Sequence, residues 1–586
     1  MRQWMVAAKK ADFYVIAEKF HVDPVVARII RNREVIGEKN IRIYLGGNLS
    51  NLSDPHQMKD MDRLVEILAQ KIRKQVHIRI IGDYDVDGVT SSHLFLTALR
   101  RVGAKVDVVI PHRIQDGYGL SLHLLQQAKE DGVDTILTCD NGIAAIDEIA
   151  WAKAQKMTVL VTDHHAVPFE EHEGRRTEKK SLADAVVNPH QQDCGYPYKE
   201  LCGAGVAWNV IRVLYENYDM DKREAEDLLD FVAMATVCDV MSLTGENRIL
   251  VKEGLKRIRH TKNIGLQALM QACNVQPENI SAYHFGYVLG PCVNATGRLD
   301  TARHALRLFE TGQETEAEEI ARDLVDLNQE RKALTLQGVE MAKKLCEEGG
   351  YENDPVLVLF LPDVHESIAG LIAGRIREMY NRPVFVLTRG EEGVKGSGRS
   401  TENYSMYENM CGCAELFTKF GGHPMAAGLS LPEENVEKFR RKINENCPLT
   451  VEEVCPDIHI DMAMPVGYAS TELVHQFALL EPFGKDNPSP LFADRNLSIS
   501  RMWVIGKNRN VLRMSVLSEY GQPVPVIFFG DVETLFAYFT EKFGQKEVEN
   551  ALHGRKNRIL FSMVYTAKID FYQGNENLQL EMKYYR

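Results

Sequence analysis

The chain has 586 residues, of which 45% are hydrophobic and 26% charged, and its formal net charge at pH 7 is −13. This length exceeds the size at which one hydrophobic core stops growing, so we expect about three to five domains of ~100–200 residues. The composition is that of a globular protein, and no apolar run approaches the ~18 residues that span a bilayer. The acidic total disfavours non-specific attraction to a phosphate backbone, although metal-binding carboxylates and local basic grooves are compatible with it.

The amino terminus MRQWMVAAKKADFYVIAEKF carries charges where a signal peptide needs an apolar stretch, which predicts a cytoplasmic protein. Residues 1–40 show no pattern that assigns them to a recognised unit. The 11 cysteines are scattered, with no CxxC pair and only Cys411 and Cys413 close together. That spacing argues against a disulfide framework or a zinc ribbon and favours buried, reduced thiols.

Between residues 76 and 165, short β-branched runs alternate with amphipathic stretches. The strands are predicted at VHIRIIG, KVDVVIP, TILTCDNG and TVLVTDHH, and the helices at TSSHLFLTALRRVG, SLHLLQQAKEDG and AAIDEIAWAKAQKM. This order predicts a parallel sheet with helices on its faces. Ligands of such sheets bind beyond the carboxyl ends of the strands, so polar groups that follow different strands can converge there.

The rest of the chain divides into a helical part, a second α/β part and a β-rich end. Residues 201–260 have helical spacing, and a charged, Pro-free stretch at 314–348 predicts a long connecting helix. PVLVLFLP, ESIAGLIAGRIREMY and RPVFVLTR restart a strand, helix, strand order up to about residue 447. Beyond NCPLTVEEVCPD, β-rich runs such as LSISRMWVIGKN and QPVPVIFFG predict a small barrel.

Acidic and histidine side chains follow several of these predicted strands and helices. Asp83, Asp85 and Asp87 lie in GDYDVDGVT, directly after an apolar run. Carboxylates this close raise each other's pKa and cost stability unless cations neutralise them. The further groups are Asp140 in TCDNGI, the triplet Asp163, His164 and His165, and Asp239 in ATVCDVMSL.

Carboxylates with one or two imidazoles suit Mn²⁺ or Mg²⁺, whereas the cysteines offer no structural zinc site. The number of ligands implies two ions, which at ~3.5–4 Å from each other neutralise the attacking and leaving oxygens of an in-line phosphoryl displacement. Each motif alone has a structural alternative, since DNG is a common turn and DHH could end a strand. GDYDVDG does not fit an EF-hand, because the long loop and its terminal Glu are missing.

The set of motifs, in this order, resembles the DHH phosphoesterase superfamily and, within it, the RecJ single-strand-specific DNA exonucleases. The resemblance covers nearly all of the chain beyond about residue 40. Besides the motifs above, it rests on NPH (188–190), GAGVAW (203–208), GPCVNATGRLD (290–300), GSGRS (396–400), GGHPMAAGLSL (421–431) and EPFGKDNPSPLF (481–492).

The resemblance implies an α/β fold, in which a parallel-sheet DHH domain is joined by a long helix to a second α/β (DHHA1) domain, with a C-terminal β-barrel of the OB-fold type. The expected divisions are an N-terminal segment (1–50), a DHH catalytic domain (51–310), a connector helix (311–348), a DHHA1 nucleotide- or phosphate-binding domain (349–450) and an OB-fold single-strand-binding domain (451–586).

The resemblance also implies roles for individual residues. One ion would be held by Asp85 and Asp140, with Asp83 as a further ligand. His165 would face the scissile phosphate, and Asp163 would orient a neighbouring imidazole. The second ion would be held by Asp87, Asp140, His164 and Asp239. The expected catalytic residues are Asp140, Asp163, His164 and His165, and the expected substrate- or phosphate-binding residues are Arg113, His165, Arg298, Ser397, Gly398, Arg399 and His423.

Some positions leave alternatives open or depart from the family pattern. Asp83 and Asp163 could be structural, and His423, at a predicted turn, could contact the leaving nucleotide or cap a following helix. Glu366 and Ser367 stand where Pro-Gly usually follows the family histidine, here His365, and Cys292 stands where a basic residue is common.

As a whole, the resemblance implies a 5′→3′ exonuclease that degrades single-stranded DNA to mononucleotides in recombination and repair, with two Mn²⁺ or Mg²⁺ ions. The expected partners are single-stranded DNA, a single-strand-binding protein and a RecQ-type helicase, with no membrane and a monomeric state. Two alternatives remain open. One is a DHH-family oligoribonuclease or cyclic-dinucleotide phosphodiesterase, and the other is a non-catalytic replication scaffold.

Overall fold

The computed structural model describes residues 3–112, 119–172, 175–299, 301–390, 393–506, 509–572 and 574–586. The chain forms two compact units, one of Asn48–Pro456 and one of Arg2–Gly47 together with Asp457–Arg586. Among the described residues, no helix combines the length and the apolar character that crossing a membrane requires.

A five-stranded sheet lies at the centre of the first unit, in the order β3-β2-β4-β5-β8, and all of its pairings are parallel. The predicted α/β order is therefore confirmed for this part of the chain. An antiparallel pair, β6 (Phe169–His172) and β7 (Arg175–Glu178), follows β5 and was not expected. The strands of the main sheet are β2 (Ile78–Ile81), β3 (Val106–Val109), β4 (Thr135–Cys139), β5 (Thr158–Thr162) and β8 (Ala185–Val187).

Helices cover both faces of this sheet. Because side chains alternate along a strand, Ile80 and Leu137 face one helical layer, and Ile81 and Ile136 face the other. The first layer contains α4 (Met61–Arg73), α5 (Val86–Arg101) and α8 (Gly203–Asn217), and the second contains α6 (Leu122–Glu130) and α7 (Ile146–Ala154).

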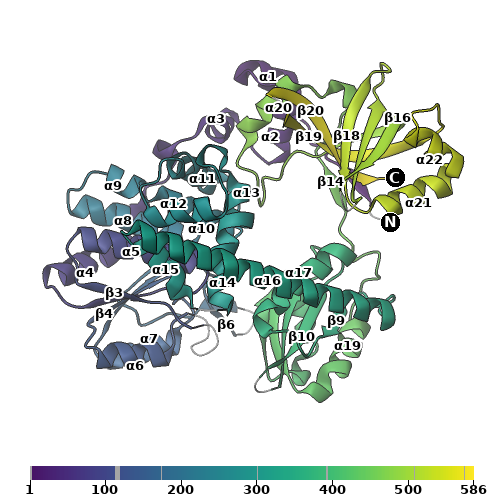
Figure 1. Ribbon diagram of the computed structural model, residues 1–586. Helices are drawn as coiled ribbons and strands as arrows, with labels where there is room; N and C mark the ends of the chain where they lie inside the picture. Colours follow the sequence, from purple (N-terminus) through teal and green to yellow (C-terminus); the bar gives the residue numbers. More distant parts are fainter. Residues whose placement is uncertain are drawn as a thin grey trace. The chain divides into compact units, whose positions relative to one another are not determined.

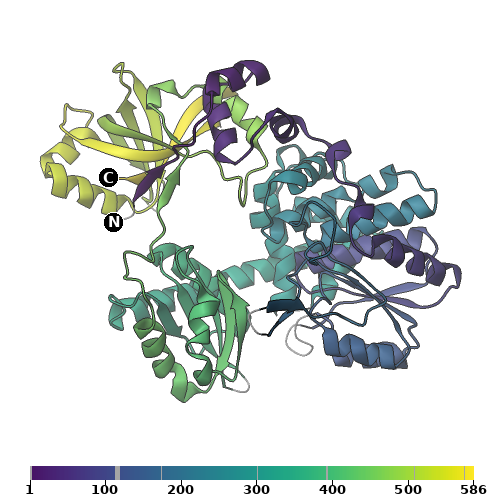
Figure 2. The ribbon, with the colours of Figure 1, turned by 180° about the vertical axis from the view of Figure 1, so that it is seen from behind.

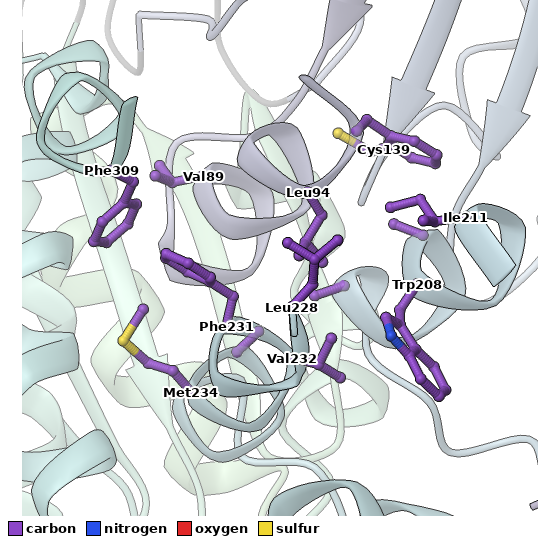
Figure 3. Close-up of a cluster of buried hydrophobic side chains, with 14 of the residues drawn as sticks. Val89, Leu94, Cys139, Trp208, Ile211, Leu228, Phe231, Val232, Met234 and Phe309 are labelled. Carbon is purple, nitrogen blue, oxygen red and sulfur yellow. The ribbon is translucent and has the colours of Figure 1, made fainter. Parts of the chain in front are cut away.

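Helix α5 begins directly after the acidic loop that follows β2, and it is buried over most of its length. The side chain of Asp85 caps it by accepting a hydrogen bond from Gly88 N–H at 3.0 Å. Figure 3 shows Leu94 of α5 in a cluster with Phe231 of α10 (Leu229–Cys238) and Phe309 of α15 (Ala302–Glu310). Each fully buried Leu or Phe of this kind contributes about 1.5–3 kcal/mol, so α5 holds the acidic loop firmly.

The predicted long helix is present as α16 (Glu314–Glu348), which runs from the helical part toward α17 (Glu366–Tyr380) and the second sheet of the same unit (Figure 1). Besides α8, α10 and α15, the helices that precede it in this part are α9 (Arg223–Glu226), α11 (Gly245–Ile258), α12 (Ile264–Ala272), α13 (Ala282–His284) and α14 (Gly290–Leu299), with a π-helical turn, η4, at Phe285–Leu289.

The second sheet has the order β12-β13-β11-β10-β9, with β9 and β10 parallel and the other pairs antiparallel. The glycine-rich GSGRS segment is the end of a central strand of this sheet and not a loop. The elements are β9 (Leu357–Phe360), α17 (Glu366–Tyr380), β10 (Val384–Gly390), β11 (Gly393–Arg399), α18 (Met406–Cys411), β12 (Lys419–His423), β13 (Ala426–Leu431) and α19 (Val436–Glu445).

The second unit contains a closed barrel. Its strands follow the order β16-β17-β18-β20-β19, and β19 pairs with β16 again, as in an OB-type barrel. The strands are β16 (Phe492–Ile505), β17 (Val511–Leu517), β18 (Pro523–Phe529), β19 (Leu560–Tyr572) and β20 (Asn575–Tyr585), with β15 (Met462–Ala463) added to β16, and α20 (Thr471–Phe477), α21 (Val532–Phe543) and α22 (Gln545–Leu552) packed against them.

The amino-terminal residues, which the sequence did not assign, pack on the barrel. Strand β1 (Trp4–Val6) pairs in parallel with β14 (Ile458–Ile460), and Figure 2 shows this purple segment beside the barrel. The buried ion pair between Arg33 and Asp461, 2.7 Å apart, joins the two segments. The helices are α1 (Phe13–Phe20), α2 (Pro24–Asn32) and α3 (Glu38–Gly46), whose buried side chains share the barrel core.

His93 on α5 makes the stability of the first unit depend on pH. Its ring is 5% exposed and lies 4.4 Å from the ring of Phe231 and 5.9 Å from that of Phe309, measured between centroids. Burial, reinforced by the charges of Arg100 and Arg101, lowers the pKa of His93 from 6.5 to about 3. The unfolded chain therefore takes up a proton below pH 6.5 that the folded protein rejects, so stability is lost as pH falls from 6.5 toward 3.

The variant His93→Leu should flatten the acid side of the stability profile. Between pH 7 and pH 5, the wild type should lose about 2 kcal/mol of unfolding free energy through this histidine, and the variant should not. Urea unfolding at both pH values measures the difference, with the exposed His260 changed to Gln as the matched control. Identical pH slopes for wild type and His93→Leu would contradict this account.

Candidate metal centre

The carboxyl ends of three neighbouring strands bring predicted acidic groups together. Asp83 follows β2, Asp140 follows β4 and Asp163 follows β5, and these strands are adjacent in the sheet. The three residues are 1%, 2% and 1% exposed. Asp140 has φ 61°, a left-handed conformation that Asp and Asn tolerate better than most residues.

The expected metal ligands form one connected cluster. His164 Nε2 lies 3.1 Å from Asp140 Oδ1 and 3.6 Å from Asp239 Oδ2. Three sets of side chains have their ligand atoms within 4.8 Å of one another, namely Asp83, Asp85 and Asp140; Asp87, His164 and Asp239; and Asp140, His164 and His165. Asp140 and His164 each belong to two of these sets, so they link the sets into one cluster.

The start of α8 fixes Asp87. Its Oδ2 accepts a hydrogen bond from Gly203 N–H at 2.6 Å, and its Oδ1 accepts one from Ala204 N–H at 2.7 Å. A helix amino terminus favours a carboxylate in this way. A Cβ at position 203 would lie 2.6 Å from Asp140 Cβ, so the approach of α8 requires glycine here. Sequence reasoning noted GAGVAW but missed this role.

Asp163 orients His165. Asp163 Oδ1 accepts hydrogen bonds from the backbone N–H of His164 and of His165, at 2.7 and 3.0 Å, and lies 2.8 Å from His165 Nδ1. Its Oδ2 accepts a hydrogen bond from Ile143 N–H at 2.9 Å. Asn188 Nδ2 donates to His165 O at 2.9 Å, which gives the NPH motif a positioning role that sequence reasoning also missed.

The electrostatics of the cluster divide its members into two groups. Burial and the charge of Asp87 raise the pKa of Asp85, and burial with the charges of Asp87 and Asp85 raises the pKa of Asp140 well above its usual value. Burial lowers the pKa of His164, which favours the neutral imidazole that metal ligation needs. Asp85 and Asp140 therefore need positive charge nearby to remain ionised.

The pair of Asp163 and His165 behaves in the opposite way. Burial opposes ionisation of both groups, but their mutual hydrogen bond and charges outweigh it. The pKa of Asp163 is lowered, and the pKa of His165 is raised to about 9. Near neutral pH, this pair therefore presents an imidazolium held by a carboxylate.

These residues fit a divalent cation. Buried carboxylates that repel one another are stable only with compensating charge, and this cluster has more carboxylates than histidines. Carboxylate oxygens with imidazole nitrogen are donors that suit Mn²⁺ or Mg²⁺. The cluster is therefore a candidate metal centre.

A cleft with a volume of about 520 Å³ lies beside the acidic loop in the first unit. Tyr84 of that loop lines it, and so does Ser397 of β11. Lys395, Lys419 and Phe420 line it as well, and sequence reasoning did not identify them. Their position next to the glycine-rich motifs could have identified them, because the two lysines can bind a phosphate and the aromatic ring can stack on a base.

The other residues expected in this region have different surroundings. Gly398 faces the core, because a Cβ there would lie 2.3 Å from Met406 Sδ. Arg399 contacts α17, where a Cβ on Gly370 would lie 2.8 Å from Arg399 Nη2, and its Nη1 donates to Gly398 O at 2.7 Å.

The positions that depart from the family pattern have structural partners. Ser367 Oγ lies 2.7 Å from His365 Nδ1, and Ser367 O accepts a hydrogen bond from Arg298 Nη1 at 2.7 Å. Glu366 forms an ion pair of 2.8 Å with Lys395, and both residues line the cleft.

His423 is exposed at the end of β12 and is followed by β13, so the alternative that it caps a helix is wrong. Arg113 lies outside the described residues.

Three sequence families match successive parts of the chain. Residues 77–236 match the DHH family, N-terminal domain, residues 353–447 match the DHHA1 domain, and residues 460–584 match the RecJ OB domain. The crystal structure of RecJ from Thermus thermophilus in complex with Mn²⁺ superposes with a TM-score of 0.81 at 25% identity, covering 100% of this chain and 79% of that one.

Individual relatives agree with these matches. The single-stranded-DNA-specific exonuclease RecJ of Haemophilus influenzae is 32% identical over 582 residues, which cover 96% of each protein. The protein of the same name from Bacillus subtilis is 32% identical over 511 residues, covering 86% of this chain and 63% of that protein. The chain therefore belongs to the RecJ family of single-stranded-DNA-specific exonucleases.

Proposed function

We propose that the chain is a metal-dependent exonuclease that degrades single-stranded DNA from the 5′ end to mononucleotides, in recombination and repair. The observation that carries this proposal is the buried cluster of carboxylates and imidazoles, which lies in a chain similar over 96% of its length to a single-stranded-DNA-specific exonuclease.

In this proposal, the cluster binds two Mn²⁺ or Mg²⁺ ions. Asp83, Asp85 and Asp140 would hold one ion. Asp87, Asp140, His164 and Asp239 would hold the other, so that Asp140 would contribute to both sites. When bound, such a pair of cations neutralises the attacking and leaving oxygens of an in-line phosphoryl displacement.

The protein's own side chains prepare the site for this reaction. The amides of Gly203 and Ala204 hold both oxygens of Asp87 in one orientation, so that this ligand is placed before any cation binds. Asp163 fixes the ring of His165 through their hydrogen bond, so that His165 can direct its other ring nitrogen at a phosphate oxygen.

The cleft beside the acidic loop supports an end-directed reaction. We propose that the 5′-terminal phosphate binds among Ser397, Lys395 and Lys419, while Tyr84 and Phe420 contact the terminal nucleotide. Arg298, Arg399 and His423 remain candidate substrate-binding residues around this region. Because Tyr84 lies between Asp83 and Asp85, a phosphate in the cleft would place the next phosphodiester near the acidic cluster.

The outer face of the barrel offers a surface for unpaired bases. Trp503 is 37% exposed, is paired across strands with Arg513, and lies 5.7 Å from the Arg501 guanidinium. Phe529, 56% exposed and paired with Val511, extends the same face. Alternating cations and aromatic rings bind single strands through backbone charge and base stacking.

The alternatives are less well supported. A dedicated enzyme for short RNA or cyclic dinucleotides needs no barrel of this kind, whereas the RecJ OB match covers residues 460–584. A scaffold without catalysis would not need to keep the whole acidic cluster. The proposal also includes a cytoplasmic location, a monomeric state, and cooperation with a single-strand-binding protein and a RecQ-type helicase, which co-purification from cells would test.

The direction and strand preference are tested with labelled DNA. With Mn²⁺, a 5′-tailed duplex should be degraded from its tail to mononucleotides, whereas blunt duplex and di- to pentaribonucleotides should be cut slowly, because the cleft accepts one strand end. Gel sizing of the products measures this. Equal rates on blunt and tailed DNA, or faster cutting of the short RNA, would contradict the proposal.

The metal assignment is tested with Asp140→Asn, which keeps a residue suited to the left-handed backbone. In EDTA the variant should melt above the wild type, since burial among like charges disfavours an ionised Asp140 and an uncharged amide avoids that cost. Added Mn²⁺ should raise the melting temperature of the wild type more than that of the variant, and calorimetry should show Mn²⁺ binding weakened by roughly tenfold or more. The exposed Asp147, changed to Asn, is the control, and unchanged Mn²⁺ binding in Asp140→Asn would refute the assignment.

The barrel face is tested with the double variant Trp503→Ala, Phe529→Ala. Loss of base stacking should weaken binding of a long single strand by about tenfold or more, at about 1–3 kcal/mol per stacked base. Fluorescence anisotropy with EDTA present measures binding without cleavage. Tyr520→Ala, which removes a 79% exposed aromatic ring at a turn of the same barrel, should leave affinity unchanged. Equal losses in both variants would count against this surface.

A further inference from the structure

Two cysteine thiols that are not among the expected metal ligands face each other in the helical part of the first unit. The Sγ atoms of Cys273 and Cys292 are 3.7 Å apart. Cys273 directly follows α12 as its C-terminal capping residue, and Cys292 lies in the first turn of α14. Cys273 is partly exposed, whereas Cys292 is 2% exposed. The proposed exonuclease reaction uses neither thiol.

The surroundings of Cys292 favour its thiolate. The thiols of Cys273 and Cys292 lie within hydrogen-bonding distance of each other, and Asn328 Nδ2 of α16 donates a hydrogen bond to Cys292 Sγ at 3.3 Å. These two hydrogen bonds, with the positive charges of Lys332 and Arg331, lower the pKa of Cys292. The thiolate is the form of cysteine that attacks peroxides and disulfides.

We propose that Cys273 and Cys292 form a reversible intrachain disulfide when the protein meets a peroxide. One thiolate attacks a peroxide oxygen, which breaks the O–O bond and gives a sulfenic acid and hydroxide, and the hydroxide takes up the proton that the thiol had released to form water. The second thiol then attacks that sulfur, so that the S–S bond forms and a second water leaves. The two thiols together supply the two electrons that reduce the peroxide, and a dithiol reverses the reaction by exchange.

The required movement is small. The sulfur atoms need to approach from 3.7 Å to the ~2.05 Å of a disulfide. Side-chain rotation and a slight shift of one helix can supply this, because Cys273 lies just past the end of α12. In closing, Cys292 exchanges its contact with Asn328 for the covalent bond.

The crosslink would tie α12 to a helix that contacts the acidic loop. Asn294 Oδ1 on α14 accepts a hydrogen bond from Val86 N–H at 3.2 Å. One turn on, a Cβ at Gly297 would lie 2.6 Å from Tyr84 O, so α14 and the loop are in close contact. The disulfide therefore restrains the helix that supports this loop. This inference does not depend on the proposed exonuclease activity.

The test is non-reducing peptide mapping of the full chain after exposure to hydrogen peroxide and alkylation of the remaining thiols. A crosslinked peptide of Cys273 with Cys292 should form in the wild type and in Cys411→Ser, and should disappear after treatment with a dithiol. It should be absent from Cys273→Ser. Cys411 is the matched control because it is the exposed cysteine.

Thermal unfolding provides a second readout. The oxidised wild type should melt above the reduced protein, since the crosslink constrains the unfolded chain, and Cys273→Ser should show no such rise. If Cys411 is oxidised while the peptide of Cys273 with Cys292 is missing, the inference is wrong. It is also wrong if other cysteine pairs crosslink to the same extent.

Discussion

Repulsion among buried carboxylates at one edge of the parallel sheet is the constraint on which the rest of the structure depends. Parallel pairing of β2, β4 and β5 aligns their carboxyl ends, so the aspartates that follow them meet. Such a cluster lowers the stability of the metal-free fold, and the surrounding structure must hold it together. The amides at the start of α8 fix Asp87, and the buried packing of α5 anchors the acidic loop.

The same constraint explains how the chain divides its tasks. The side chains that repel one another lie at the ends of strands and helices, which position a site more precisely than loops do. The residues suited to phosphate and base contact lie in the cleft formed with the second sheet and on the face of the barrel. Asp163 and His165 belong to the first group by position but are suited to phosphate contact, since their mutual hydrogen bond keeps an imidazolium beside the acidic cluster.

The sequence predicted much of this from local patterns. Strand and helix periods located the parallel sheet, and polar residues just past the strands located the acidic cluster, because parallel topology alone makes them converge. The pairing of Trp4–Val6 with Ile458–Ile460 could not be predicted, since both segments are short and distant in sequence. Glycines disfavour strands, yet Gly393–Arg399 is one, because it is paired on both sides. The contacts of Asp87 with α8, and of Cys273 with Cys292, depend on packing between helices and leave no periodic signal.

The central claim is that the acidic cluster exists to bind divalent cations. Crystals of the protein soaked in Mn²⁺ and measured at the manganese absorption edge test it most directly. The account predicts strong anomalous peaks enclosed by Asp87, Asp140, His164 and Asp239, with a second set beside Asp83 and Asp85. A map without peaks in this cluster, while its side chains keep the positions described, would contradict the account.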